Sequence, residues 1–457
     1  MNRKLLSIVL AAGTLLLISC NDEETWNLDN TENLISLSYP ENIFSGYSNV
    51  YHYANSMDGK LLASKELSVS QNDFFEVSRA KNGAYNRFDL TRVYVRESGN
   101  VKYISLNTYI GILPFSKYYD IPYPPSVSIG PAIIKFTNVP PYNSFTISSV
   151  KSTINYGDLN TRTYYFTLYD NLPRCIFIRL NTPSGNFYKF VDNLVPDQTT
   201  TISLADMNNT FTSGSVNFNK KSFNSFHIEF DRFYINDFSS PQFHLFDSDF
   251  TTPPAQLNYP STFLANNYSI TELSGFHNDA GYPVDKESIC LIYSATPPVH
   301  ASLMDGEFYL QEKSFYNNLK YDFSSDQIVH LASFFWSHSY DFLNANGFRV
   351  SWTVYVSPSI REFLIPGIPE AILKSIEDNH GISDLYIEGM NLGYAVLSWS
   401  SRTNDYDGYM EKFFLGSGGT AHGDEFRYLV FPNTETKNSS SVKAPGSLYD
   451  PREMILR

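Results

Sequence analysis

Cysteine and basic residues are both scarce in this sequence. Only three of its 457 residues are cysteine, and 33 Lys and Arg are outnumbered by 47 Asp and Glu, for a formal net charge of −14. An acidic surface of this kind disfavours nucleic acid and anionic membrane faces as partners. After the first 20 residues no apolar run reaches 18 residues, so we expect no later segment to span a membrane. The hydrophobic content of 42% is too high for disorder and indicates a globular protein.

The amino terminus carries a secretory signal. Arg3 and Lys4 form a short positive region, and Leu5 to Ile18 is an apolar stretch too short to cross a bilayer. The sequence Leu17-Ile18-Ser19-Cys20 that ends it resembles a bacterial lipobox, in which the signal is cleaved before the cysteine and the cysteine is lipidated. The resemblance implies a signal peptide over 1–19 and a permanent attachment to outer-membrane lipid through Cys20, because several acyl chains anchor a protein stably.

An acidic run, Asn21-Asp22-Glu23-Glu24, follows the lipobox. It resembles the export signal of Bacteroidota-type surface lipoproteins, which implies a protein facing the cell exterior. A solvated acidic tether is the equal alternative. We expect 20–34 to hold the lipidated cysteine and a flexible tether.

The other two cysteines, Cys175 and Cys290, lie in strand-like runs. An oxidising compartment permits a disulfide. Because the two are expected in different domains, two buried free thiols are the favoured prediction.

Short runs rich in Tyr, Phe, Val, Ile and Thr recur at spacings near ten residues, a pattern typical of β-sandwiches. Proline is dense over 111–131, which suggests a boundary there, because proline disrupts a paired sheet. A polar stretch at 207–214 suggests a second boundary. The sequence therefore predicts an all-β fold of tandem sandwiches, with domains at 35–110 and 132–206 and a larger, mainly-β domain at 215–457.

The third region carries the clearest individual elements. Residues 348–356 alternate between apolar and polar side chains and predict a strand. Residues 369–379 predict the one helix, with Pro369 in its first position and Gly381 after its end. Residues 324–336 fit either a capped helix or a buried strand.

Motifs for catalysis are absent from the sequence. His330 and His338 are too far apart to share a metal on either a strand or a helix, and the stretch 404–408 lacks the ligands of a calcium loop. The glycine-rich stretch 416–420 lacks the ending of a phosphate loop. We therefore expect no catalytic residues, no metal and no cofactor, and a protein that is not an enzyme. A carboxylate pair of the glycosidase type cannot be found from spacing and stays open.

Aromatic side chains are abundant, at 16%, and an exposed ring suits sugars and protein partners alike. Trp352 lies on an apolar strand face and is predicted to be core. Trp336 and Trp399 are the candidate ligand-binding residues.

The layout as a whole resembles Bacteroidota surface lipoproteins with transthyretin-like or immunoglobulin-like sandwiches. The resemblance implies a non-catalytic, lipid-anchored binding protein with a glycan or surface-protein partner. A structural or adhesive fimbrial-type subunit is the alternative, and a glycoside hydrolase is a second one.

Overall fold

The computed structural model describes residues 31–432 with internal gaps, so Cys20 and most of the predicted tether lie outside the described residues. The gaps are 81–85, 120–126, 150, 171, 210, 216, 220–221, 234–241, 253–255, 261–268, 278–285, 295–299, 313–318, 341–346, 383–384, 386–389 and 416–423. The all-β prediction is confirmed, because strands in several sheets make up most of the described chain.

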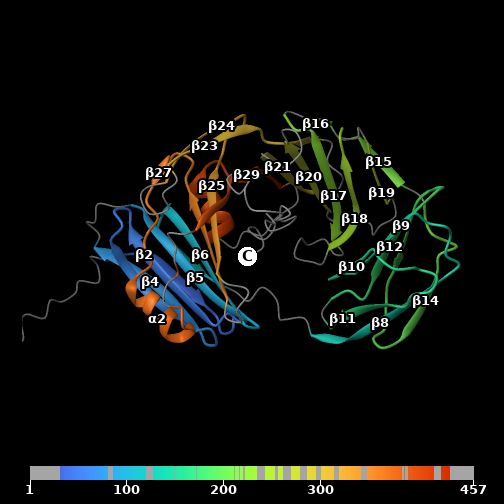
Figure 1. The fold of residues 1–457 in the computed structure, drawn as a ribbon, viewed down its shortest axis with the longest axis horizontal. Helices are drawn as coiled ribbons and strands as arrows, with labels where there is room; N and C mark the ends of the chain where they lie inside the picture. The colour runs from blue at the N-terminus through green and yellow to red at the C-terminus, as the bar shows by residue number, and fades with distance from the viewer. Residues whose placement is uncertain are drawn as a thin grey trace, which may run out of the picture.

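One sheet of twelve strands runs through most of the molecule (Figure 1). It is antiparallel except where β6 and β26 run parallel. Its strands, in spatial order, are β18 (Gln242–Phe250), β17 (Ser225–Phe233), β20 (Ser269–His277), β21 (Lys286–Ser294), β29 (Glu425–Pro432), β28 (Asn391–Ser400), β25 (Leu331–Tyr340), β26 (Phe348–Val356), β6 (Val101–Ile112), β5 (Phe88–Ser98), β2 (Asn49–Ser56) and β3 (Leu61–Leu67).

The junction of β6 with β26 corrects the predicted domain division. Residues 35–110 do not close a sandwich of their own, because β6 pairs along its length with a strand from the predicted third domain. The Trp352 indole donates to the Thr108 hydroxyl at 2.8 Å across this junction, and both side chains are buried. The first and third predicted domains therefore share one sheet.

Two layers cover the two faces of this sheet. One face packs against a small sheet of β4 (Asp73–Ala80), β1 (Thr31–Tyr39) and β7 (Phe115–Tyr118), and against α3 (Tyr406–Tyr409) with the π-helix η3 (Met410–Leu415). The other face packs against β23 (Gly306–Glu312), β24 (Leu319–Ser325), β27 (Glu362–Phe363) and α2 (Glu370–His380). Each interface holds a hydrophobic core, so this part of the molecule has three layers.

The predicted tether is shorter than expected. Strand β1 begins at Thr31, and Leu34, Ile35 and Leu37 are buried in the core between the small and large sheets. Residues 31–34 thus belong to the fold, because the apolar residues that follow them hold the strand in place between β4 and β7.

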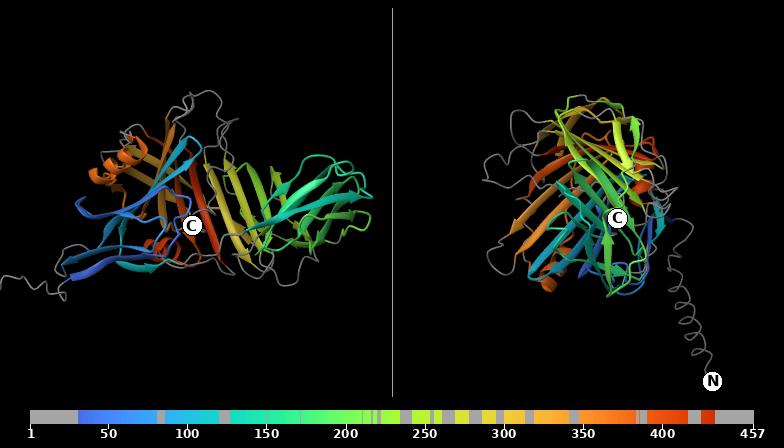
Figure 2. Two further views of the ribbon diagram at one scale, coloured as in Figure 1. Left: turned by 90° about the horizontal axis from the view of Figure 1, so that it is seen from below. Right: turned by 90° about the vertical axis from the view of Figure 1, so that its right-hand side faces the viewer.

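Residues 128–204 form a separate two-sheet sandwich with its own core, in the place of the predicted domain 132–206. It lies at the opposite end of the long axis from α2 (Figure 2). One sheet holds β10 (Thr153–Ile154), β9 (Ser144–Ser149), β12 (Ile176–Thr182) and β13 (Gly185–Val191), and the other holds β11 (Tyr164–Tyr169), β8 (Ser128–Thr137) and β14 (Thr199–Ser203).

The proline-rich stretch 111–131 is not a simple linker. It contains the strand β7, and Pro131 lies inside the paired strand β8 opposite Thr167. The ladder tolerates Pro131 because β14 pairs with β8 only from Ile133 onward, so no strand hydrogen bond requires the missing N–H.

The second predicted boundary, 207–214, also contains structure. Asn208 bridges to Tyr188, and β15 (Phe211–Ser215) pairs with β19 (Gln256–Pro260). One further short pair joins β16 (Asn217–Asn219) to β22 (His300–Ser302).

The predictions for the third region are largely confirmed. The predicted strand is β26 and the predicted helix is α2, with Gly381 in the left-handed conformation at φ 66° after its end. Pro369 is the N-cap rather than the first helical residue. The ambiguous stretch 324–336 resolves as the end of β24 and the start of β25, so its strand interpretation is the right one.

Candidate functional site

The two tryptophans predicted to bind a ligand have different surroundings. Trp336 is 2% exposed and packs beside Phe334, so it is a core residue and the prediction for it is wrong. Its strand faces α2 and the β23–β24–β27 layer, which cover the ring. Trp399 is half-buried, and the guanidinium of Arg427 lies over its indole at 4.6 Å from the ring centroid. A sugar would have to displace that cation to stack on the same face.

The prediction for the cysteines is confirmed, and His330 lies in the core. His330 is buried, and its Nδ1 lies 3.0 Å from the Thr403 hydroxyl. Cys175 and Cys290 are free and buried, and burial raises the pKa of the Cys175 thiol to about 12. No group of three metal-binding side chains occurs among the residues that the structure describes.

The stretch 404–408, which lacks the ligands of a calcium loop, contains the start of the short helix α3. Asp405 caps α3 by accepting from the Gly408 N–H at 2.9 Å. Asp407 forms a bidentate ion pair with the Arg87 guanidinium, with N–O distances of 2.6 and 2.7 Å. Both carboxylates thus have structural partners. The glycine-rich stretch 416–420 lies outside the described residues.

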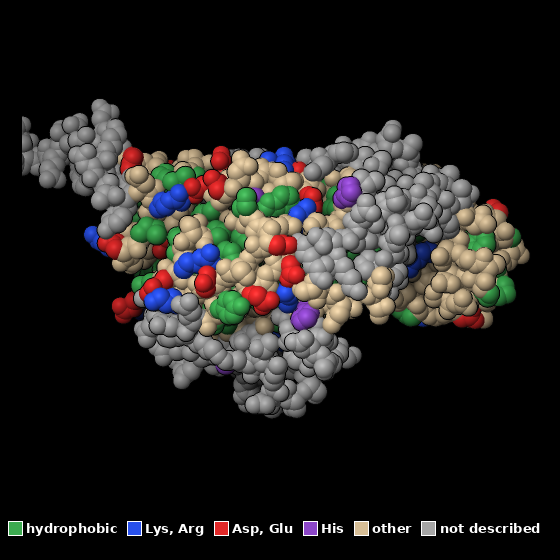
Figure 3. All heavy atoms as spheres, turned by 90° about the horizontal axis from the view of Figure 1, so that it is seen from above, with side chains coloured by type: hydrophobic (Ala, Val, Ile, Leu, Met, Phe, Trp, Pro, Cys, Tyr) green, Lys and Arg blue, Asp and Glu red, His purple; other side chains and the backbone are tan. Residues whose placement is uncertain are grey.

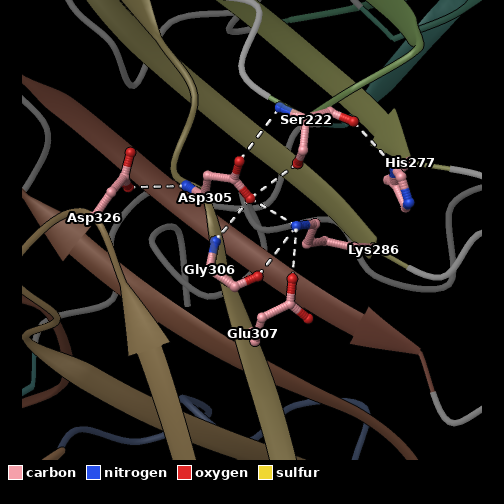
Figure 4. A network of polar contacts seen from close by, with 7 residues as sticks. All are labelled: Ser222, His277, Lys286, Asp305, Gly306, Glu307 and Asp326. Atoms are coloured by element: carbon pink, nitrogen blue, oxygen red, sulfur yellow. Dashed lines mark hydrogen bonds and ion pairs between the residues drawn. The ribbon is translucent and has the colours of Figure 1, made fainter.

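A polar network near the start of β21 brings together Ser, His, Lys and Asp side chains (Figure 4). Lys286 is buried and donates to Asp305 at 2.6 Å and to the Gly306 carbonyl at 3.1 Å. Although burial opposes the charge on Asp305, the hydrogen bonds from Lys286 and Ser222 outweigh it and lower its pKa.

The same network is not arranged as a nucleophile and its base. His277 Nδ1 lies 2.9 Å from the backbone carbonyl of Ser222, whereas the Ser222 hydroxyl donates to Asp305 at 3.0 Å. In a serine–histidine pair the imidazole would have to accept from that hydroxyl, and here the Asp305 carboxylate, itself held by Lys286, does so instead. These contacts join β20, β21 and β23, so they are structural.

A pocket of about 290 Å³ opens where β5, β6 and the β2–β3 hairpin meet the segment around β27. Most of the residues that line it are apolar. Ile110, Phe363 and Pro366 are buried among them, and Met57 and Leu364 stand at the rim with exposures of 39% and 49%. Apolar side chains also surface in small groups between charged ones on the face in Figure 3. A mainly apolar hollow with a few polar groups is the usual form of a binding site.

Asp89 gives this pocket its polar character. Its side chain lines the pocket and is only 5% exposed, and Oδ1 accepts from the Gly111 N–H at 2.8 Å. Burial raises the pKa of Asp89 to about 7, against the effect of that hydrogen bond. A carboxyl that is buried at a pocket and perturbed in this way is a candidate ligand contact.

Sequence reasoning missed this site. Asp89 precedes a strand-like run and has the pattern of a turn residue, and nothing local indicates that residues 360–366 lie beside it. The one sequence signal for this site was the position of Asp89, a carboxylate directly before a strand-like run.

Comparisons with known proteins add little. No known family model and no curated protein matches the sequence. A fimbrial assembly protein from Parabacteroides distasonis aligns with a TM-score of 0.13 and 9% identity over 38% of this chain and 90% of that chain. A bacterial ice-binding adhesin of 1.5 MDa aligns with a TM-score of 0.11 and 10% identity, over 55% of this chain and 92% of that chain. Both scores are too low to support any inference. In the described part of the chain, no helix is long and apolar enough to cross a bilayer.

Proposed function

We propose that this chain is a lipid-anchored, non-catalytic binding protein of the bacterial outer membrane, facing the cell exterior, with a glycan or surface-protein partner. The Asp89 pocket carries the proposal. A buried carboxyl beside apolar walls does not improve stability, because burial opposes its charge. Retaining it at an opening suits recognition of a ligand.

The lipobox at Cys20 supports the anchor. A Cys20→Ala chain should be released from the membrane fraction in a detergent phase separation, because it lacks the acyl chains. Protease added to intact cells should degrade the wild-type protein. Membrane retention of Cys20→Ala contradicts the anchor, and full protease resistance contradicts the outward orientation.

Binding is tested at the rim of the pocket. The partner should be captured from a glycan array or from purified surface proteins by the chain carrying Cys20→Ala. Leu364→Arg, which replaces an exposed rim side chain, should abolish the capture. Leu373→Arg is the matched control, because Leu373 is a similarly exposed leucine on α2. Turnover of a polysaccharide that one acidic substitution abolishes would instead establish a hydrolase.

One observation favours the structural or adhesive alternative. Strand β11 is the edge of its sheet, and no described strand pairs with its outer side. The Ile133 N–H and the Pro131 carbonyl are bonded toward the β14 side, so the alternate residues of β8 bond β11. It follows that Tyr165 and Thr167 direct their backbone groups outward. Tyr165 is also 62% exposed, which suits an added strand.

A proline tests this edge. Thr167→Pro removes an outward N–H and leaves the β8 ladder intact. It should prevent self-assembly or strand capture in a light-scattering assay if β11 accepts a strand. Unchanged assembly would exclude this role for β11.

A further inference from the structure

The ionisable residues that line the Asp89 pocket are both acids. They are Asp89 at the buried end and Glu362 at the exposed end, and no Lys, Arg or His among the described residues lines it. Glu362 pairs with Lys320 at 3.0 Å, but no hydrogen bond or ion pair to a cationic side chain is present at Asp89 among the described residues. The charge of the cavity therefore favours a positive ligand group.

The hydrogen-bonding capacity of Asp89 is largely unused. An ionised carboxylate offers about four acceptor positions, and the Gly111 N–H fills one of them. A primary ammonium group carries three donors and matches the remainder better than a neutral hydroxyl. Because Asp89 is buried, such a charged hydrogen bond is stronger there than in water.

The apolar walls indicate which part of the ligand lies next to its positive group. Ile110, Ile360 and Phe363 flank the space between the rim and Asp89. At about 290 Å³ the pocket lies at the lower end of small-molecule sites, which span roughly 300–1,000 Å³. This size suits one extended side chain. A lysine places four methylenes against apolar walls and its ammonium beyond them.

We propose that the Asp89 pocket receives a lysine side chain of a protein partner, with the methylenes along Ile110, Ile360 and Phe363 and the ammonium on the Asp89 carboxylate. The inference rests on the proposed binding function and names its ligand class. A sugar suits the pocket less well, because in the described lining Phe363 is the single aromatic residue and Asp89 the single buried polar side chain. The rim leucine and methionine would pack against the partner backbone around that lysine.

The test uses the secreted chain with Cys20→Ala and two small probes, N-acetyl-lysine methylamide and its norleucine counterpart, which has the same stem without the amine. In a calorimetric or NMR titration at pH 8, the lysine probe should bind saturably and at least tenfold more tightly than the norleucine probe. Asp89→Asn, which keeps the shape and removes the charge, should weaken the lysine probe at least tenfold. Asp378→Asn, on the exposed face of α2, should leave its affinity unchanged.

A second variant covers the case in which Asp89→Asn perturbs the fold. Leu364→Arg at the rim places a cation at the entrance and should abolish binding of the lysine probe. Equal binding of the two probes, or affinity unchanged in Asp89→Asn and Leu364→Arg, overturns the lysine assignment. If the lysine probe fails while a glycan is captured in a manner sensitive to Leu364→Arg, the assignment falls and the binding function stands. If Leu364→Arg changes the binding of neither probe and of no glycan or surface protein, both the lysine assignment and the proposed binding function are contradicted.

Discussion

The buried carboxyl of Asp89 should make the protein less stable as the pH rises. Its folded pKa is raised to about 7, whereas an unfolded aspartate titrates near 3.9. Between these values the folded state holds a proton that the unfolded state has released, so the free energy of unfolding falls with increasing pH. About three pKa units at about 1.4 kcal/mol each give a loss of about 4 kcal/mol by pH 8. At pH 4 and below, the contribution disappears.

Asp89→Asn isolates this effect, because the amide oxygen can still accept from the Gly111 N–H. Urea unfolding followed by tryptophan fluorescence should show the variant to be more stable than wild type at pH 8, by an amount that shrinks toward pH 4. Glu287, whose pKa burial also raises to about 7, adds a slope of the same sign to both proteins and cancels in the comparison. Asp378→Asn should show no such difference. A variant less stable than wild type at pH 8, or a difference independent of pH, would refute the reasoning.

Three other predictions concern packing and reactivity. Thr108→Val should cost about 1–3 kcal/mol of unfolding free energy, because at nearly constant volume it removes the hydroxyl that accepts from the buried Trp352 indole N–H and bonds Thr91, and Thr108→Ser should cost less. Gly306→Ala should cost about 1–3 kcal/mol in the same urea assay, since a Cβ there would collide with the Ser324 carbonyl oxygen, and an unchanged midpoint would contradict the close approach of the two strands. Cys175 and Cys290 should not react with a thiol reagent at pH 8 until urea unfolds the chain, because both are buried and burial raises both pKa values; fast labelling of the native protein would contradict their burial.

The sequence predicted the local elements well. The alternation of β26 and the Pro369–Gly381 signals of α2 come from neighbouring residues, whose periodicity and capping act over one or two turns. The sandwich at 128–204 was also predictable, since its strands lie close together in the sequence.

The pairings that organise the rest of the molecule were not predictable in this way. Val101–Ile112 meets Phe348–Val356 across a long intervening stretch of chain, and no local pattern specifies a partner at that separation. The burial of Trp336 depends on β27 and α2, and the surroundings of Asp89 depend on residues 360–366, all of which come from elsewhere in the sequence. The sequence around Trp336 and around Asp89 therefore did not indicate the role of either residue.

The position of β29 has a consequence for the order in which the chain acquires its structure. This strand, made of residues 425–432, lies between β21 and β28 and is the only link between the four strands β18–β17–β20–β21 and the seven from β28 to β3 in the described sheet. A chain emerging from its amino terminus can complete the 128–204 sandwich early, because all of its strands are then available. The large sheet remains in two unjoined parts until residues 425–432 have emerged. During that interval the facing edges of β21 and β28 carry unpaired backbone groups, which makes them the surfaces that a chaperone would need to shield.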